Sequence, residues 1–102
     1  MKIVAVTACP NGIAHTNMVA KALKEEADKR GLEIKLEKQG ALGMENEITE
    51  EDLAEADVAI LAVSTKIEGE SRFDNLPTHK VKIDKAIRDT EKIVDEALKL
   101  VE

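Results

Sequence analysis

One cysteine stands in a short stretch where a nucleophile and an anion-binding loop could act together. Cys9 follows an apolar run, and Gly12, His15 and Thr16 come within the next seven residues. A loop that leads into a helix points unpaired backbone N–H groups, and the positive end of the helix dipole, at an anion. The same field lowers the pKa of a cysteine thiol and favours the nucleophilic thiolate. The spacing therefore indicates a phosphate-binding loop that carries its own nucleophile.

The same residues also have plainer interpretations. A lone cysteine after a strand is often a small buried hydrophobe, and His15 near a helix start can be an ordinary side chain. Gly12 lets the backbone approach a ligand closely, whereas Pro10 removes one N–H donor. The joint spacing of cysteine, glycine, histidine and threonine favours a functional site.

Composition restricts the function further. The chain has 102 residues, which predicts a single domain over residues 1–102. Its formal charge is −6 and its one aromatic residue is Phe73, so it lacks the basic surface with aromatic stacking side chains that nucleic acid requires. No apolar run approaches the roughly 20 residues that span a bilayer, and Met1 leads directly into a strand rather than a signal peptide. We therefore expect a cytoplasmic domain. One cysteine provides neither a disulfide nor a structural zinc site, so we expect no metal and no cofactor.

Hydrophobic periodicity predicts the strands that position this stretch. Residues 2–6 and 57–63 are apolar runs, which are typical of strands buried on both faces. Residues 33–38 and 80–83 alternate apolar and charged side chains, as edge strands do. Residues 39–43 are expected to form a loop.

Helical spacing predicts three further elements. Apolar residues over 18–27 indicate an amphipathic helix that Gly31 ends as a C′ residue. Residues 49–52 have the capping-box spacing that begins a helix. A last helical stripe covers residues 86–101, with a restart near residues 89–90.

This order of elements predicts an α/β domain: a small open four-stranded parallel sheet with helices on both faces, a Rossmann-like three-layer sandwich. Two apolar strands inside and two alternating strands outside give the spatial order 2-1-3-4. Open α/β sheets bind ligands at the carboxyl ends of their strands where the order reverses. The Cys9 loop and the start of the polar segment from Ser64 to Pro77 should meet there. That segment is either a functional loop or a solvated excursion.

Two cysteine chemistries suit such a loop. In low-molecular-weight tyrosine phosphatases, five residues separate the cysteine from an arginine that forks onto the phosphate oxygens. His15 occupies the arginine position here. Without the fork, the residues favour a relay in which a thiolate accepts an activated phosphoryl group over a phosphatase.

The stretch from Val6 to Thr16 resembles the active-site loop of the fructose-type enzyme IIB of the bacterial phosphotransferase sugar-uptake system. The likeness continues through Gln39-Gly40, residues 55–62 and Arg72-Phe73, and covers nearly the whole chain. It implies a protein-phosphocysteine–sugar phosphotransferase in which the cysteine accepts a phosphoryl group from phosphohistidine on enzyme IIA. The group then passes to fructose or a related sugar that enters through the enzyme IIC permease. The resemblance also implies that the domain associates with the inner face of the membrane through this permease.

The resemblance assigns roles to individual residues. Cys9 is the catalytic nucleophile, Asn11 replaces the usual Thr or Ser with another donor, and Ser64 stands near a position that is often acidic in the family. Arg72 could screen phosphate charge or form a structural salt bridge, and Ser64 is a second accessory candidate. The expected phosphate cradle consists of Pro10, Asn11, Gly12, Ile13, Ala14, His15 and Thr16.

Three other functions stay open on the sequence. A phosphatase-like hydrolase would turn over an aryl phosphate. A regulatory module would bind phosphate or a partner without chemistry and would never carry covalent phosphate. A redox sensor would depend on oxidation of Cys9, although the chain has no resolving cysteine.

Overall fold

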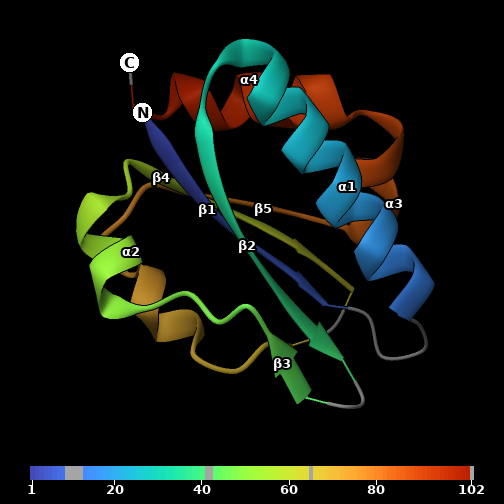
Figure 1. Cartoon of the computed structure of the whole chain (residues 1–102), viewed down its shortest axis with the longest axis horizontal. Coiled ribbons are helices and arrows are strands. Elements are labelled where there is room, and N and C mark those ends of the chain that lie inside the picture. Colours follow the sequence, from blue (N-terminus) through green and yellow to red (C-terminus); the bar gives the residue numbers. More distant parts are fainter. Residues whose placement is uncertain (9–12, 41–42, 65, 102) are drawn as a thin grey trace.

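The computed structural model describes residues 1–8, 13–40, 43–64 and 66–101. Within these residues, five strands form one mixed sheet with helices on both faces (Figure 1). The strands are β1 (Lys2–Ala8), β2 (Glu33–Gly40), β3 (Gly43–Glu45), β4 (Val58–Val63) and β5 (Thr78–Val81). The helices are α1 (Ile13–Arg30), α2 (Glu50–Glu55), the 3-10 helix η1 (Glu70–Phe73), α3 (Ile83–Arg88) and α4 (Thr90–Lys99).

The sheet has the order β3-β2-β1-β4-β5. The four predicted strands are present as β2-β1-β4-β5, all parallel and in the predicted order. The prediction of a purely parallel, four-stranded sheet is wrong, because β3 adds an antiparallel strand beside β2. Gly40 pairs with Gly43, and Gly43 has a φ of 109°, which a residue without a side chain adopts at little cost. Gln39, Gly40 and Gly43 therefore belong to paired strands rather than to the predicted loop, while residues 41–42 lie outside the described residues.

The fourth predicted strand is displaced by two residues. It covers Thr78–Val81 instead of 80–83, and Ile83 already begins α3. The alternation of apolar and charged residues continues across this boundary because Ile83, the first residue of α3, is also an apolar residue that is buried. Periodicity alone therefore does not mark where this strand ends.

Two apolar clusters lie on opposite faces of the sheet. Ile3, Ala5 and Ile60 pack with residues of α1, α3 and α4. Val4, Val6 and Leu61 pack on the other face with Phe73 of η1 and with Ile48 before α2. Because β1 and β4 send alternate side chains to each cluster, they are buried on both faces, as their continuous apolar runs predict.

Local signals in the sequence place the helix ends well. Gly31 has a φ of 71° after α1, as a C′ residue does. Thr49 and Asp52 form the predicted capping box, and the last helical stretch is interrupted at Asp89 between α3 and α4. The predicted apolar stripe of α1 is wrong at Met18, which is 52% exposed. None of the described helices is long and apolar enough to cross a membrane.

Thr49→Ala is expected to lower the free energy of unfolding by about 1 kcal/mol, because it removes the hydroxyl that accepts the Asp52 N–H.

The hydrogen bond from the Thr49 N–H, and then that from Lys2 Nζ, hold the pKa of Asp52 well below its ordinary value of 3.8. This carboxylate therefore stabilises the fold at neutral pH, and its contribution is lost as the pH falls below 3.8. Urea unfolding at pH 7 and pH 3 measures both effects. Thr49→Ser keeps the hydroxyl and should behave like the wild type.

Candidate active site

The candidate nucleophile lies between two well-defined elements. β1 ends at Ala8 and α1 begins at Ile13, so residues 9–12 connect a central strand to a helix, as the sequence predicts. Cys9, Pro10, Asn11 and Gly12 lie outside the described residues, as do the side chains of Ile13, Ala14 and His15.

The N-terminus of α1 carries a field suited to an anion. The helix has 18 residues, and its first turn contains no acidic residue that would offset the positive end of the helix dipole. The last turn ends with Lys29 and Arg30, which complement the negative end. A negatively charged group beside the first turn is therefore stabilised by the helix.

The sheet brings the two predicted loop starts together. β1 lies between β2 and β4, and Ala8 pairs in register with Gln39 on one side and Val63 on the other. The Ser64 N–H donates to the Ala8 carbonyl at 3.0 Å. The start of the segment after β4 therefore lies directly beside the residue that precedes Cys9. The Ser64 side chain is exposed at this edge.

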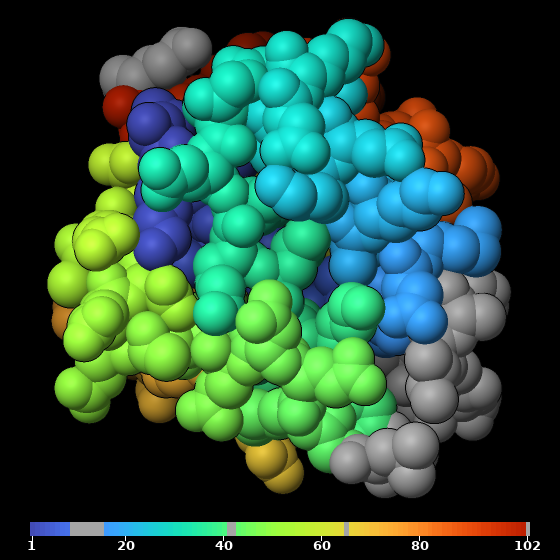
Figure 2. Space-filling view, in the orientation of Figure 1, coloured from blue at the N-terminus to red at the C-terminus, as the bar shows by residue number. Residues whose placement is uncertain are grey.

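Thr16 is the one predicted cradle residue whose side-chain burial is described, and it is 4% exposed. It lies in α1 beside a pocket of about 40 Å³, and a shallower groove of about 440 Å³ continues along the helix. Figure 2 shows this face, where the blue residues of α1 lie next to the green residues of β2 and β3. Both hollows are lined by Asn17, Lys38 and Glu45. Both hollows therefore lie where the first turns of α1 meet the ends of β2 and β3.

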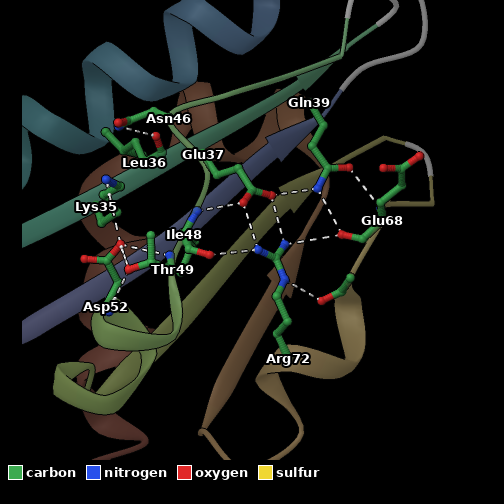
Figure 3. Close-up of polar contacts among 11 residues, drawn as sticks. Lys35, Leu36, Glu37, Gln39, Asn46, Ile48, Thr49, Asp52, Glu68 and Arg72 are labelled. Atoms are coloured by element: carbon green, nitrogen blue, oxygen red, sulfur yellow. Dashed lines mark hydrogen bonds and ion pairs between the residues drawn. The ribbon is translucent and has the colours of Figure 1, made fainter.

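Arg72 forms a partly buried salt bridge with Glu37. Its Nη1 and Nη2 donate to the two carboxylate oxygens of Glu37, each at 2.9 Å, and Glu37 is completely buried (Figure 3). Of the two roles that the sequence left open for Arg72, its side-chain contacts are those of a structural salt bridge. A role in screening phosphate stays a prediction.

Hydrogen bonds keep this buried carboxyl charged. Burial by itself raises the pKa of Glu37, but donors from Arg72, Gln39 and the Ile48 N–H outweigh it, so the pKa lies below its ordinary value. The hydrogen bond to Glu37 in turn raises the pKa of Arg72. The pair is therefore ionised at neutral pH. Sequence reasoning missed Glu37, because its alternating segment predicts a solvent-facing charge.

No group of three or more His, Cys, Asp or Glu side chains in the described ranges could hold a metal ion.

Comparison with known proteins identifies the family. The family model described as the lactose/cellobiose-specific IIB subunit of the PTS, the sugar phosphotransferase system, matches residues 4–96. The PTS system fructose-like EIIB component 2 of Escherichia coli strain K12 is 46% identical over 93 residues, which are 91% of this chain and 88% of that protein. The PTS system fructose-specific EIIB'BC component of Rhodobacter capsulatus is 39% identical over 98 residues, which are 96% of this chain and 17% of that protein.

A solved structure agrees with these relatives. The crystal structure of a domain from the fructose-specific IIABC component of Borrelia burgdorferi is 49% identical, with a TM-score of 0.91, and the match covers 96% of this chain and 93% of that one. The chain therefore belongs to the IIB family of the PTS, as a fructose-type EIIB domain that relays a phosphoryl group and so acts as a phosphotransferase.

Proposed function

We propose that Cys9 is the residue on which this domain carries the phosphoryl group. The supporting observation is its place in the chain, directly after Ala8 at the carboxyl end of a central strand and four residues before α1. The strand order reverses around this strand, which is where open α/β sheets bind ligands. The positive end of α1, whose first turn has no acidic residue, favours both a thiolate and a phosphate.

The first step is an in-line displacement at phosphorus. The Cys9 thiolate attacks the phosphorus of a phosphohistidine, the N–P bond breaks as the S–P bond forms, and the imidazole leaves. A thiolate is already deprotonated, so this step requires no general base on this chain.

The phosphate cradle follows the nucleophile. Backbone N–H groups after Cys9 would hold the three equatorial oxygens, with no N–H from the proline. Asn11, His15 and Thr16 offer side-chain donors. The proposed cradle comprises Pro10, Asn11, Gly12, Ile13, Ala14, His15 and Thr16.

The second step transfers the group to a sugar. A sugar hydroxyl attacks the phosphocysteine phosphorus, the S–P bond breaks as the O–P bond forms, and the hydroxyl proton is released to water. This returns the Cys9 thiolate.

The proposed partners are an enzyme IIA that supplies the phosphohistidine and an enzyme IIC permease that presents the sugar. The Rhodobacter capsulatus relative is named an EIIB'BC component, which joins B and C parts and supports the second partner. We propose that the sugar is fructose or a related sugar, because the relatives at 46% and 39% identity are named fructose-like and fructose-specific. In this arrangement the domain lies in the cytoplasm and meets the inner face of the membrane through the permease.

Mass spectrometry tests the proposal directly. The wild-type chain is incubated with phosphoenolpyruvate and the upstream phosphate carriers, digested at neutral pH and mapped. We expect one added phosphoryl group, on Cys9. A chain that stays unmodified, or that carries the group on another residue, would overturn the assignment.

Hydrolysis of an aryl phosphate is expected to stay at the background rate, because a histidine at position 15 lacks the fork that an arginine gives to the phosphate oxygens. Release of the phenolate from an aryl phosphate at pH 5 to 7 measures this. Turnover that depends on Cys9 would favour the phosphatase-like alternative instead.

A further inference from the structure

A buried polar cluster lies near the carboxyl end of β2, beside the end of β1 that leads to Cys9. The proposed phosphoryl-transfer steps do not use it. Besides the two bonds from Arg72, the Glu37 carboxylate accepts from the Ile48 N–H at 2.9 Å and from Gln39 Nε2 at 2.7 Å. The four acceptor positions of this fully buried carboxylate are therefore filled, two by Arg72 and one each by Gln39 and the Ile48 N–H. We call Glu37, Gln39 and Arg72 the Glu37 cluster (Figure 3).

The cluster holds the backbone of one loop. Gln39 Oε1 accepts from the Glu68 N–H at 2.9 Å, and Gln39 Nε2 donates to the Glu68 carbonyl at 3.0 Å. The side-chain amide thus pairs with Glu68 as a neighbouring strand would. Arg72 Nε donates to the Gly69 carbonyl at 2.7 Å, and Nη2 donates to the Glu68 carbonyl at 3.3 Å. Residues 66–73, here called the rim loop, are therefore fixed to the end of β2.

Gly69 makes this geometry possible. Its φ of 72° lies in the left-handed region, and a Cβ built at this position would lie 2.6 Å from Arg72 Nε. A side chain at residue 69 would therefore force the guanidinium to move without changing any charge in the cluster. The glycine permits the close approach of the loop backbone to Arg72.

The rim loop lies near the end of β1, which leads to the candidate nucleophile. Gln39 pairs in register with Ala8, which precedes Cys9, and the Ser64 N–H binds the Ala8 carbonyl from the other side. The loop also presents charged side chains outward, since Lys66 and Glu68 are exposed. We expect a protein that delivers a phosphoryl group to Cys9 to approach across this end of the sheet.

We infer that Glu37, Gln39 and Arg72 are positioning residues for donor docking, which hold the rim loop as a preformed surface beside Cys9. This inference rests on the proposed function. A buried ion pair is poor support for a role in stability alone, because apolar side chains of similar size often stabilise a core equally well. Apart from the bonds to Glu37, most hydrogen bonds of Gln39 and Arg72 go to the backbone of the rim loop, so the cluster fixes the conformation of that loop. Preformed surfaces bind more tightly because fewer groups must be ordered on association.

Arg72→Lys tests the inference. Lysine keeps the charge but has no fork and no Nε–H, so it cannot hold Glu37 and Gly69 together. With phosphorylated IIA as the donor, we expect KM to rise about three- to tenfold. The maximal rate of single-turnover transfer to Cys9 should stay within about twofold, because the described hydrogen bonds of Arg72 go to Glu37 and to backbone carbonyls.

Arg30→Lys is the matched control. Arg30 also bridges two carboxylates, with Nε donating to Glu26 and Nη2 paired with Asp95, but it lies at the far end of α1. It should reduce thermal stability without changing KM. A purely structural role for Arg72 would give the same pattern in Arg72→Lys, and would overturn the inference.

Gly69→Ala provides a second variant in case Arg72→Lys does not fold. It displaces the guanidinium while every charge stays, and it should raise KM for the donor as Arg72→Lys does. A fall in maximal rate with unchanged KM in either variant would place Arg72 at the phosphate, and would contradict a positioning role.

The two proposals fail in different ways. Should the wild-type chain accept no phosphoryl group from IIA, the proposed function is wrong. Should it accept the group, while the folded variants keep the wild-type KM, only the inference is wrong.

Discussion

Cys9→Ser is expected to lose phosphoryl acceptance by about 10³-fold or more, while the fold stays intact. A serine hydroxyl is almost fully protonated at neutral pH, so the variant presents no anion to the phosphohistidine phosphorus. The substitution replaces one sulfur atom by an oxygen and leaves the rest of the chain unchanged, so its effect on stability should be small. Transfer of radiolabelled phosphate from IIA measures the loss, and circular dichroism verifies the fold. Phosphorylation of the variant at the wild-type rate would show that another residue carries the group.

Cys9→Ser combined with Leu100→Cys is the matched control. Leu100 is 48% exposed and directly follows α4, so the double variant has one thiol per chain, placed on the surface and outside the rim loop. If the helix field and the loop N–H groups activate Cys9, the relocated thiol should accept no phosphoryl group. Acceptance at residue 100 would mean that an exposed thiol is sufficient and that the strand-to-helix connection has no special role.

Features that depend on neighbouring residues are predictable from this sequence. The apolar runs of β1 and β4 predict central strands because both faces of these strands are covered. Thr49 and Asp52 predict the start of α2 because both capping hydrogen bonds form within one turn. The connection of residues 9–12 between β1 and α1 is predictable for the same reason, since a strand and a helix with clear periodicity lie on each side of it.

Features that depend on distant residues are not predictable in this way. β3 has only three residues, too few for any periodicity, and it exists because the chain reverses beside β2. Glu37 has the sequence signature of a solvated edge-strand charge, yet it is fully buried because Arg72, 35 residues away in the chain, pairs with it. Nothing local distinguishes this glutamate from the exposed Glu33 on the same strand. The Glu37 cluster therefore required the fold.

Arg72→Met is expected to lower the free energy of unfolding at pH 7 by about 3 kcal/mol, because it leaves the buried Glu37 carboxylate without its counter-ion. Two neutral donors remain, the Ile48 N–H and Gln39 Nε2, so the site stays partly satisfied. Urea unfolding followed by circular dichroism measures the loss. Glu37→Met combined with Arg72→Met removes both charges and should recover most of the lost stability, since no unpaired ion stays in the core. A double variant as unstable as Arg72→Met would show that the cost arises from lost packing rather than from the unpaired charge.

The pH dependence gives this prediction its sharpest test. In the wild type the pKa of Glu37 is held below its ordinary value of 4.5, so the charged pair stabilises the fold at neutral pH, and this contribution is lost as the pH falls below 4.5. In Arg72→Met the burial of Glu37 is no longer offset, so its pKa should rise above the unfolded value and protonation should favour the folded state. The gap in stability between the two proteins should therefore be widest at pH 7 and narrow steadily towards pH 4. A difference in stability that stays constant over this range would mean that Glu37 titrates alike in the wild type and in Arg72→Met. Arg72 would then not be compensating the charge of Glu37.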